Sequence, residues 1–271
     1  MANKVTIYGT DGKAGAQVAL PKQFAEPIRT DLIKKAVLAV QSKTRQPYGA
    51  DPQAGRRHSV DVSRRRRDYR GSYGKGISRV PRKVMSRRGG QFQWEGAFAP
   101  GTKGGRRAHP PKSEKDWTKK INVKENRKAI RSAIAATLDT ALAKARGHIA
   151  PTTYPFAVAD GIEHITKTKE LRAALLALGF EQELSRAAEV QSRGGLAATR
   201  GRSRKIRKSI LIVASSADAP IVLATKNILG VEACGVNELS AEMLAPGAQA
   251  GRLTLFTVGA LKVMEDNKLF A

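Results

Sequence analysis

Apolar residues recur at helical spacing on both sides of a long stretch that contains almost none. Their positions predict a helix over residues 29–44, with Thr30 as its N-cap, and a second helix over residues 122–145. Asn122 and Glu125 have the spacing of a capping box at the start of the second helix. Because the two helices flank the stretch that lacks apolar residues, we expect a folded domain that is interrupted there.

Beyond Pro151 the pattern alternates between short apolar runs and helical repeats, as in βαβ units. The expected strands cover 156–159, 210–214, 231–234 and 253–256, and the expected helices cover 169–178, 182–190, 220–229 and 258–265. The strand at 210–214 is apolar throughout, which is typical of a strand covered on both faces. Near the N-terminus, apolar runs at 5–8 and 17–20 flank Asp11-Gly12, a hairpin signal.

These elements predict an α/β fold: a three-layer domain with a mainly parallel sheet flanked by helices. We expect residues 1–44 and 116–271 to form this single globular domain. Residues 45–115 are expected to be a long extended basic loop inserted in it.

The composition of residues 45–115 sets them apart from the rest of the chain. They contain eleven of the 25 glycines, only six Val, Ile, Leu or Met residues, and nineteen Lys or Arg against five Asp or Glu. So little apolar area cannot offset the entropy of ordering, so the isolated loop is predicted to be disordered and to take its shape from a partner. Each arm of the loop could reach about 100 Å when extended.

Net charge indicates the kind of partner. The chain has 271 residues and a formal net charge of +26, which calls for a polyanion. Residues 186–209 carry eight basic residues and one acidic residue, and we expect the sheet to hold the cations of residues 199–208 at its N-terminal rim. The lysine pairs Lys34-Lys35 and Lys119-Lys120 are typical of solvated helix or loop surfaces.

Arginine predominates over lysine in the loop, and its planar fork can bind phosphate in two places or stack on a base. Aromatic residues interleave with these cations and offer stacking surfaces for unpaired bases; they are Tyr69, Tyr73, Phe92, Trp94 and Phe98. The sequence contains no helix-turn-helix, zinc-finger or basic-zipper pattern and no RNP-type strand motif. A glycine- and arginine-rich strand pair that folds on binding suits the irregular surfaces of structured RNA better than a uniform duplex groove, so we expect RNA.

Motifs for catalysis or cofactor binding are not found in the sequence. There is no phosphate-binding G-x-x-x-x-G-K-[ST] loop, no G-x-G-x-x-G opening a predicted helix, and no G-x-S-x-G elbow. The four histidines lie far apart and the single cysteine, Cys234, falls in a predicted buried strand, so no metal site, cofactor or disulfide is expected. No apolar run has the length of a signal peptide or membrane span, so we expect a soluble intracellular protein with no membrane contact.

Two alternatives to a structural RNA-binding protein stay open. The first is an RNA-modifying or nucleotide-using enzyme, with Asp160 and Glu163 at the carboxyl edge of the sheet, although a turn and a helix-start acid are the better explanation of both residues. The second is a chromatin-like protein that binds duplex DNA. We interpret the chain as not being an enzyme.

Local strings resemble a known family. They are Ser72-Tyr73-Gly74-Lys75-Gly76, Val80-Pro81-Arg82, residues 106–112 (RRAHPPK), residues 131–137 (RSAIAAT), Arg200-Gly201-Arg202, Ala245-Pro246-Gly247 and residues 251–257 (GRLTLFT). In this order, and over nearly the whole length, they resemble the family of the fourth protein of the large ribosomal subunit, in its archaeal and eukaryotic form and with an archaeal-like length.

That resemblance implies an α/β domain on the solvent side of the large subunit and a loop threaded through 23S-type rRNA to the wall of the nascent-peptide exit tunnel, in a cytoplasmic ribosome. The implied partners are rRNA, neighbouring ribosomal proteins and the nascent peptide. The matching loop tip consists of Gly71, Ser72, Tyr73, Gly74, Lys75, Gly76 and Ile77. Ile77 departs from the family pattern, in which many members carry a basic residue.

The candidate RNA-binding residues are mostly the cations of the two basic regions. They are Arg56, Arg57, Arg64, Arg65, Arg66, Arg67, Arg70, Lys75, Arg79, Arg82, Lys83, Arg87, Arg88, Trp94, Lys103, Arg106, Arg107, His109, Lys112, Arg200, Arg202, Arg204, Lys205 and Arg207.

Overall fold

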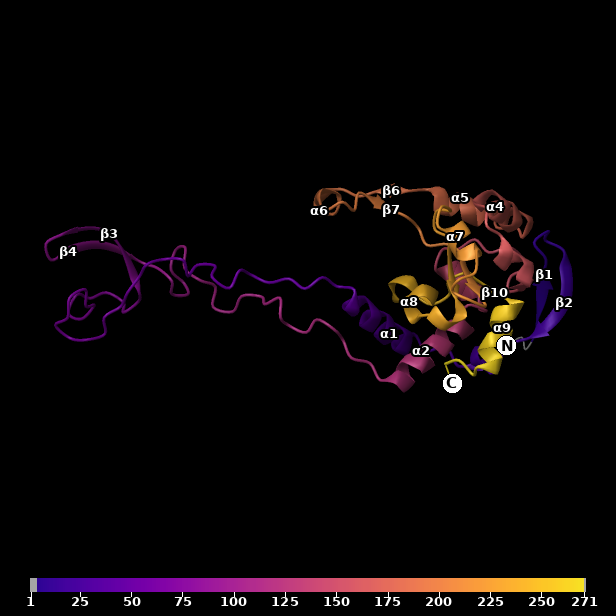
Figure 1. The fold of residues 1–271 in the computed structure, drawn as a ribbon, viewed down its shortest axis with the longest axis horizontal. Helices are drawn as coiled ribbons and strands as arrows, with labels where there is room; N and C mark the ends of the chain where they lie inside the picture. The colour runs from indigo at the N-terminus through magenta and orange to yellow at the C-terminus, as the bar shows by residue number, and fades with distance from the viewer. Residues whose placement is uncertain (1–3, 271) are drawn as a thin grey trace. The chain divides into compact units, whose positions relative to one another are not determined.

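The computed structural model describes residues 4–270 and separates into two compact units (Figure 1). Unit 1 comprises Met1–Thr44 and Thr118–Ala271, and unit 2 comprises Arg45–Trp117. Each unit is described by itself below.

The centre of unit 1 is a six-stranded sheet with the order β2-β1-β5-β10-β8-β9. The strands are β1 (Lys4–Tyr8), β2 (Ala14–Ala19), β5 (Ala157–Val158), β8 (Leu211–Ala214), β9 (Glu232–Gly235) and β10 (Thr254–Thr257). Only the β1–β2 pair is antiparallel; the other four pairings are parallel. The prediction of an α/β fold with a mainly parallel sheet is therefore confirmed, as is the N-terminal hairpin.

Unit 1 has helices on both faces of this sheet and one helix, α6 (Gly195–Thr199), that lies away from it. The other helices are α1 (Thr30–Lys43), α2 (Val123–Ala136), α3 (Thr140–Ala145), α4 (Thr168–Ala177), α5 (Glu181–Ala188), α7 (Ile221–Thr225), α8 (Ala241–Leu244) and α9 (Val258–Asp266). Short 3-10 turns lie at η1 (Lys22–Ala25), η2 (Asp160–His164), η3 (Val236–Glu238) and η4 (Pro246–Ala248). Within residues 4–270, no helix has the length and apolarity needed to cross a bilayer.

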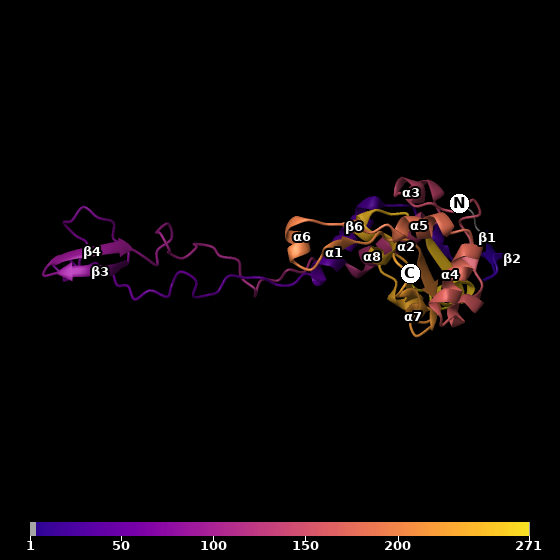
Figure 2. The same cartoon turned by 90° about the horizontal axis from the view of Figure 1, so that it is seen from above.

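Alternate side chains of β8 belong to different core clusters. Leu211 and Val213 pack with residues of α1, α2, α8 and α9, whereas Ile212 and Ala214 pack with residues of α3, α4 and α7. Since side chains of a strand alternate between faces, β8 is covered on both sides, as its continuous apolar sequence predicted. Figure 2 shows the fold from above, with α4 and α7, which both contribute to the second core cluster, in the same part of unit 1.

The helices that flank unit 2 differ in detail from the sequence prediction. The helix expected over 122–145 is broken, because Asp139 starts α3 by accepting hydrogen bonds from the amides of Ala141 and Leu142 at 2.9 and 3.3 Å. Thr30 is the first helical residue of α1 and Arg29 occupies the N-cap position. Asn122 does occupy the N-cap of α2, but its side chain makes no capping hydrogen bond.

Candidate nucleic-acid interface

The most regular part of unit 2 is an antiparallel hairpin of β3 (Arg82–Arg88) and β4 (Gln91–Gly96). A two-glycine turn joins the strands, and Gly89 has a φ of +56°, a conformation that glycine adopts without strain. Phe92 and Trp94 lie two residues apart and so share one face of β4, where their rings stack with centroids 5.3 Å apart. The sequence prediction of an extended loop did not include this hairpin.

Cations of unit 2 surround this aromatic pair. The Lys75 ammonium lies 5.8 Å from the centroid of Phe92 and 5.3 Å from that of Trp94, and the Arg82 guanidinium lies 5.9 Å from Trp94. Cation–π contacts of this kind contribute about 0.5–1 kcal/mol each at exposed sites. They hold the turn that contains Lys75 against the hairpin without an aliphatic core.

Tyrosines 69 and 73 extend the same pattern. Tyr69 packs edge-on against Phe92 at 5.6 Å, and its hydroxyl accepts a 2.7 Å hydrogen bond from Arg87. Tyr73 lies beneath the guanidinium of Arg79, 4.6 Å from the ring centroid, and accepts a 3.2 Å hydrogen bond from it. In this structure, the aromatic rings that the sequence predicted to stack on bases instead contact lysines and arginines of unit 2 itself.

The predicted loop tip, residues 71–77, is a tight turn. Gly71 and Ser72 are buried, and the Gly71 amide donates to the Asp68 carbonyl at 3.0 Å. Gly74 and Gly76 both have positive φ, at +73° and +66°, and a Cβ on either would meet nothing within 4 Å. Lys75 is exposed between them. The backbone geometry, rather than lack of space, explains these two glycines.

The two segments near the ends of unit 2, residues 45–58 and 98–117, carry further candidate residues around a second aromatic ring. Arg56 and Arg106 lie 5.9 and 6.0 Å from the ring centroid of Phe98. The Ala50 amide donates to the Pro111 carbonyl at 2.8 Å, which pairs the two arms locally. Arg57, Lys103, Arg107, His109 and Lys112 are exposed, and Arg57 forms an ion pair with Asp51.

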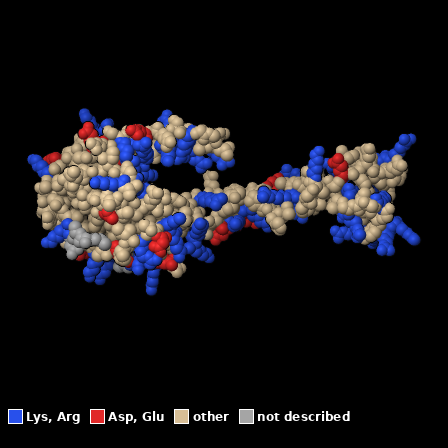
Figure 3. Space-filling model, turned by 180° about the vertical axis from the view of Figure 1, so that it is seen from behind, with Lys and Arg blue, Asp and Glu red and all other residues tan. Residues whose placement is uncertain are grey.

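Most of the remaining candidate residues in unit 2 have exposed side chains. Arg64, Arg65, Arg66, Arg67, Arg70, Arg79, Arg87 and Arg88 are exposed, whereas Arg82, Lys83, Trp94 and Arg106 are half-buried. Figure 3 shows many Lys and Arg side chains and few Asp or Glu on the visible face of this segment. Such a surface favours a polyanion because its like charges repel in the free protein.

The second basic region, in unit 1, lies at the predicted N-terminal rim of the sheet only at its C-terminal end. Gln191–Ser192 (β6) pairs with Arg204–Lys205 (β7), and α6 lies between them, so residues 189–208 form a separate basic ribbon. Arg200 and Arg202 are exposed just beyond α6. Lys208 does lie at the N-terminal rim of the sheet, where it pairs with Glu232, the first residue of β9. Arg204 and Lys205 instead lie on β7 of the ribbon, because the chain leaves the sheet region after α5 and returns only at β8. Gly195 and Gly201 both have positive φ, and glycines at these two positions could have indicated the turns of this excursion.

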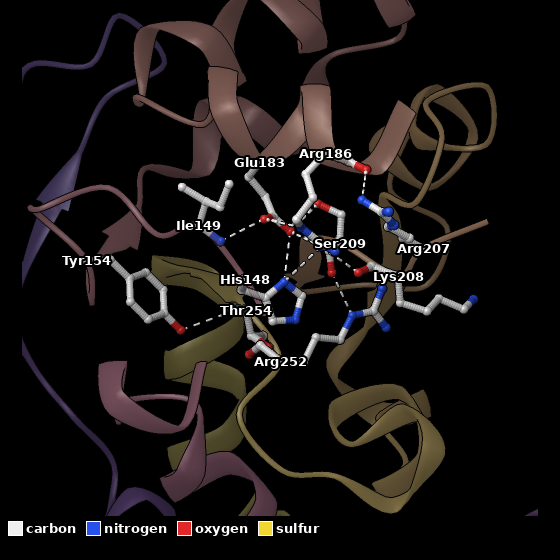
Figure 4. Close-up of polar contacts among 10 residues, drawn as sticks. All are labelled: His148, Ile149, Tyr154, Glu183, Arg186, Arg207, Lys208, Ser209, Arg252 and Thr254. Carbon is white, nitrogen blue, oxygen red and sulfur yellow. Dashed lines mark hydrogen bonds and ion pairs between the residues drawn. The ribbon is translucent and has the colours of Figure 1, made fainter. Parts of the chain in front are cut away.

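A buried polar network fixes the base of the basic ribbon (Figure 4). The fully buried carboxylate of Glu183 accepts hydrogen bonds from five groups: His148 Nδ1 (2.8 Å), the Ile149 amide (2.9 Å), Arg186 Nε (2.8 Å), Arg186 Nη2 (2.6 Å) and Ser209 Oγ (2.9 Å). Burial alone would raise the pKa of Glu183, but these donors lower it to about 2.

Both ends of the ribbon join this network. Arg186 Nη2 donates to the Lys208 carbonyl at 3.0 Å, and Arg207 donates to the Arg186 carbonyl at 3.3 Å. On the other side of Ser209, the buried Arg252 donates to the Ser209 carbonyl and to Glu232, each at 2.8 Å. The network was not predicted, since its members come from four distant parts of the sequence.

The residues proposed for an enzymatic alternative have structural partners. Glu163 accepts hydrogen bonds from the amide and hydroxyl of Ser215, at 2.9 and 2.5 Å, and from the Thr257 hydroxyl at 2.5 Å. Asp160 accepts from the Gly259 amide at 2.5 Å. These bonds join η2 to the ends of β8 and β10 and to the start of α9, which accounts for both carboxylates without a ligand.

The cysteine and the histidines also show no reactive arrangement. Cys234 is buried in β9, and burial raises the pKa of its thiol to about 12. Over residues 4–270, no three His, Cys, Asp or Glu side chains gather in a way that could hold a metal ion. Within residues 4–270, the two basic regions are therefore the strongest candidates for a binding site.

Comparisons with known proteins agree with this reading. Residues 18–267 match the family described as "Ribosomal protein L4/L1 family". The chain is 47% identical over 267 residues to the large ribosomal subunit protein uL4 of Nanoarchaeum equitans, covering 98% of the chain and 99% of the relative. It is 42% identical to uL4 of Pyrobaculum aerophilum, covering 96% and 89%, and 43% identical to uL4 of Methanococcoides burtonii, covering 96% of each. With this extent of similarity, together with an α/β domain and an arginine-rich insertion, the chain belongs to the ribosomal protein L4/L1 family.

Proposed function

We propose that this protein is a structural component of the large ribosomal subunit that binds 23S-type rRNA through unit 2 and through the basic ribbon. The observation that carries the proposal is the construction of unit 2, in which cations stack on aromatic rings in place of an aliphatic core. A segment built in this way is held together by interactions that RNA phosphates and bases can also make.

The two basic regions are held in place by different contacts, which suggests that they contribute differently to RNA binding. Exposed arginines in unit 2 would neutralise phosphates that converge where rRNA strands pack closely. The ribbon is fixed at its base by the Glu183 network and would present Arg200 and Arg202 from a defined position. The relatives of this chain are named as large-subunit ribosomal proteins, which supports the proposal that this chain is a component of the large subunit.

The turn at residues 71–77 is proposed to line the nascent-peptide exit tunnel, next to a loop of a neighbouring ribosomal protein. Support comes from its glycines at positive φ, which keep the turn narrow, and from the exposed Lys75 between them. A narrow turn with one cation could approach both rRNA phosphates and a passing peptide.

Competition between nucleic acids tests the RNA-binding part of this proposal. We expect a large-subunit rRNA fragment to outcompete duplex DNA at equal phosphate concentration, because unit 2 suits irregular rather than uniform surfaces. Binding of the rRNA fragment should weaken steeply with salt, with log K falling by about 0.7–0.9 for each neutralised phosphate per tenfold rise in salt. A slope equivalent to fewer than about two phosphates, or preference for duplex DNA, would contradict it.

A further inference from the structure

Two lysine pairs that are 85 residues apart in sequence meet in one hollow of unit 1. Lys34 and Lys35 come from α1, and Lys119 and Lys120 come from the segment that precedes α2. Together with Asp31 and Leu38 they line a hollow of about 360 Å³, hereafter the lysine hollow. Sequence alone assigned each pair to a solvated surface.

The segment that carries the second pair is held against α1. The Lys119 amide donates a 2.8 Å hydrogen bond to the hydroxyl of Ser42, in the last turn of the helix. Ile121 packs against the core cluster that includes residues of α1 and α2. The convergence of the four lysines is thus fixed by backbone and core contacts.

Charge in the lysine hollow is strongly unbalanced. Four lysines and one carboxylate line it, and that carboxylate, Asp31, is already bound by Arg29 at 3.2 and 2.5 Å. Glu125, just outside the lining, is bound by Lys35 at 2.7 Å. The remaining positive charge favours an anion in the hollow, and lysine binds phosphate well as a point charge.

We propose that the lysine hollow binds backbone phosphates of rRNA and is an RNA contact separate from unit 2 and the basic ribbon. This inference rests on the proposed function. The lining contains no aromatic ring or arginine, so the contact would position the RNA without reading its bases. Ser42 and Lys119 flank unit 2 in the sequence, so RNA held here would lie beside the point where the chain leaves unit 1.

A triple substitution with a matched control tests the proposal in the full chain. Lys34→Gln, Lys119→Gln and Lys120→Gln together remove three charges and spare Lys35, which pairs with Glu125. Lys13→Gln, Lys22→Gln and Lys262→Gln remove the same charge from exposed positions outside the hollow. The measurement is affinity for a large-subunit rRNA fragment across a salt series, with thermal unfolding to verify that both variants fold.

We expect the hollow variant to reduce the steepness of the salt dependence by about two, because three contacts each contribute about 0.7. If the two proteins bind equally at about 1 M salt, the affinity of the hollow variant at about 0.1 M salt should be about 100-fold lower than that of wild type. The control variant should stay close to wild type. Equal slopes for the two variants, with steep wild-type binding, would overturn the lysine hollow alone. A wild-type protein that binds rRNA without a steep slope would overturn the proposed function and this inference together.

Discussion

Replacing Arg64, Arg65, Arg66 and Arg67 with glutamine is expected to weaken rRNA binding by about three orders of magnitude at about 0.1 M salt. All four side chains are exposed in unit 2, and each is proposed to neutralise one phosphate, which contributes about 0.7 to the slope of log K against log salt. Four contacts therefore contribute about 2.8 to that slope. Affinity measured between about 0.1 and 0.5 M salt checks both numbers.

A lysine version of the same variant separates charge from geometry. Lysine keeps each positive charge but lacks the planar fork, so we expect the salt slope to return to the wild-type value while affinity stays lower. The melting temperature of unit 1 should not change in either variant, because these residues contribute nothing to its core. Glutamine and wild-type proteins with the same affinity and slope would show that this arginine run does not contact RNA.

The second large effect concerns stability and arises at Glu183. Glu183→Ala is expected to lower the free energy of unfolding by about 3–5 kcal/mol, because it leaves buried donors of Arg186, His148 and Ser209 without their acceptor. In a protein of this size that corresponds to a melting temperature about 10 °C lower. Glu170→Ala removes an exposed pair with Lys167, and as the control it should change stability by less than about 1 kcal/mol.

The same residue gives stability a pH dependence in the acid range. The folded-state pKa of Glu183 is about 2 and its ordinary value is 4.5, so the folded state holds the ionised form more strongly. Its contribution is complete above about pH 4.5 and is lost as pH falls through about 2. Between about pH 6 and pH 3, wild type should lose about 2 kcal/mol through this group, and Glu183→Gln should lose none of it. The free energy of unfolding is measured by urea denaturation at both pH values. An equal loss of stability in wild type and Glu183→Gln would show that Glu183 does not cause this pH dependence.

Sequence patterns predicted the elements whose signal is local. The run from Ile210 to Ala214 became β8 because every position is apolar, and both faces of that strand are indeed covered. Asp11-Gly12 marked the N-terminal hairpin because Gly12 must adopt positive φ there, at +74°. These predictions required only neighbours in sequence.

Features that depend on composition or on distant partners were missed. Gly89-Gly90 joins β3 and β4, and Phe92 and Trp94 alternate along β4, but the high charge of the surrounding residues predicted disorder. The break of the second helix depended on Asp139 acting as a cap rather than as an interior residue. The Glu183 network and the lysine hollow join residues far apart in the chain, and no local pattern could bring them together.

Whether unit 2 owes its shape to RNA is the central question. An isolated two-stranded hairpin is marginally stable in water, and the contacts of unit 2 are mostly exposed. Amide hydrogen exchange on the purified, RNA-free chain, followed by the same measurement with a large-subunit rRNA fragment, answers it directly. We predict near-unprotected exchange across residues 45–117 in the free protein, protection of β8 and β10, and slowing of residues 45–117 once RNA is bound. Slow exchange throughout residues 45–117 in the RNA-free protein would contradict the account.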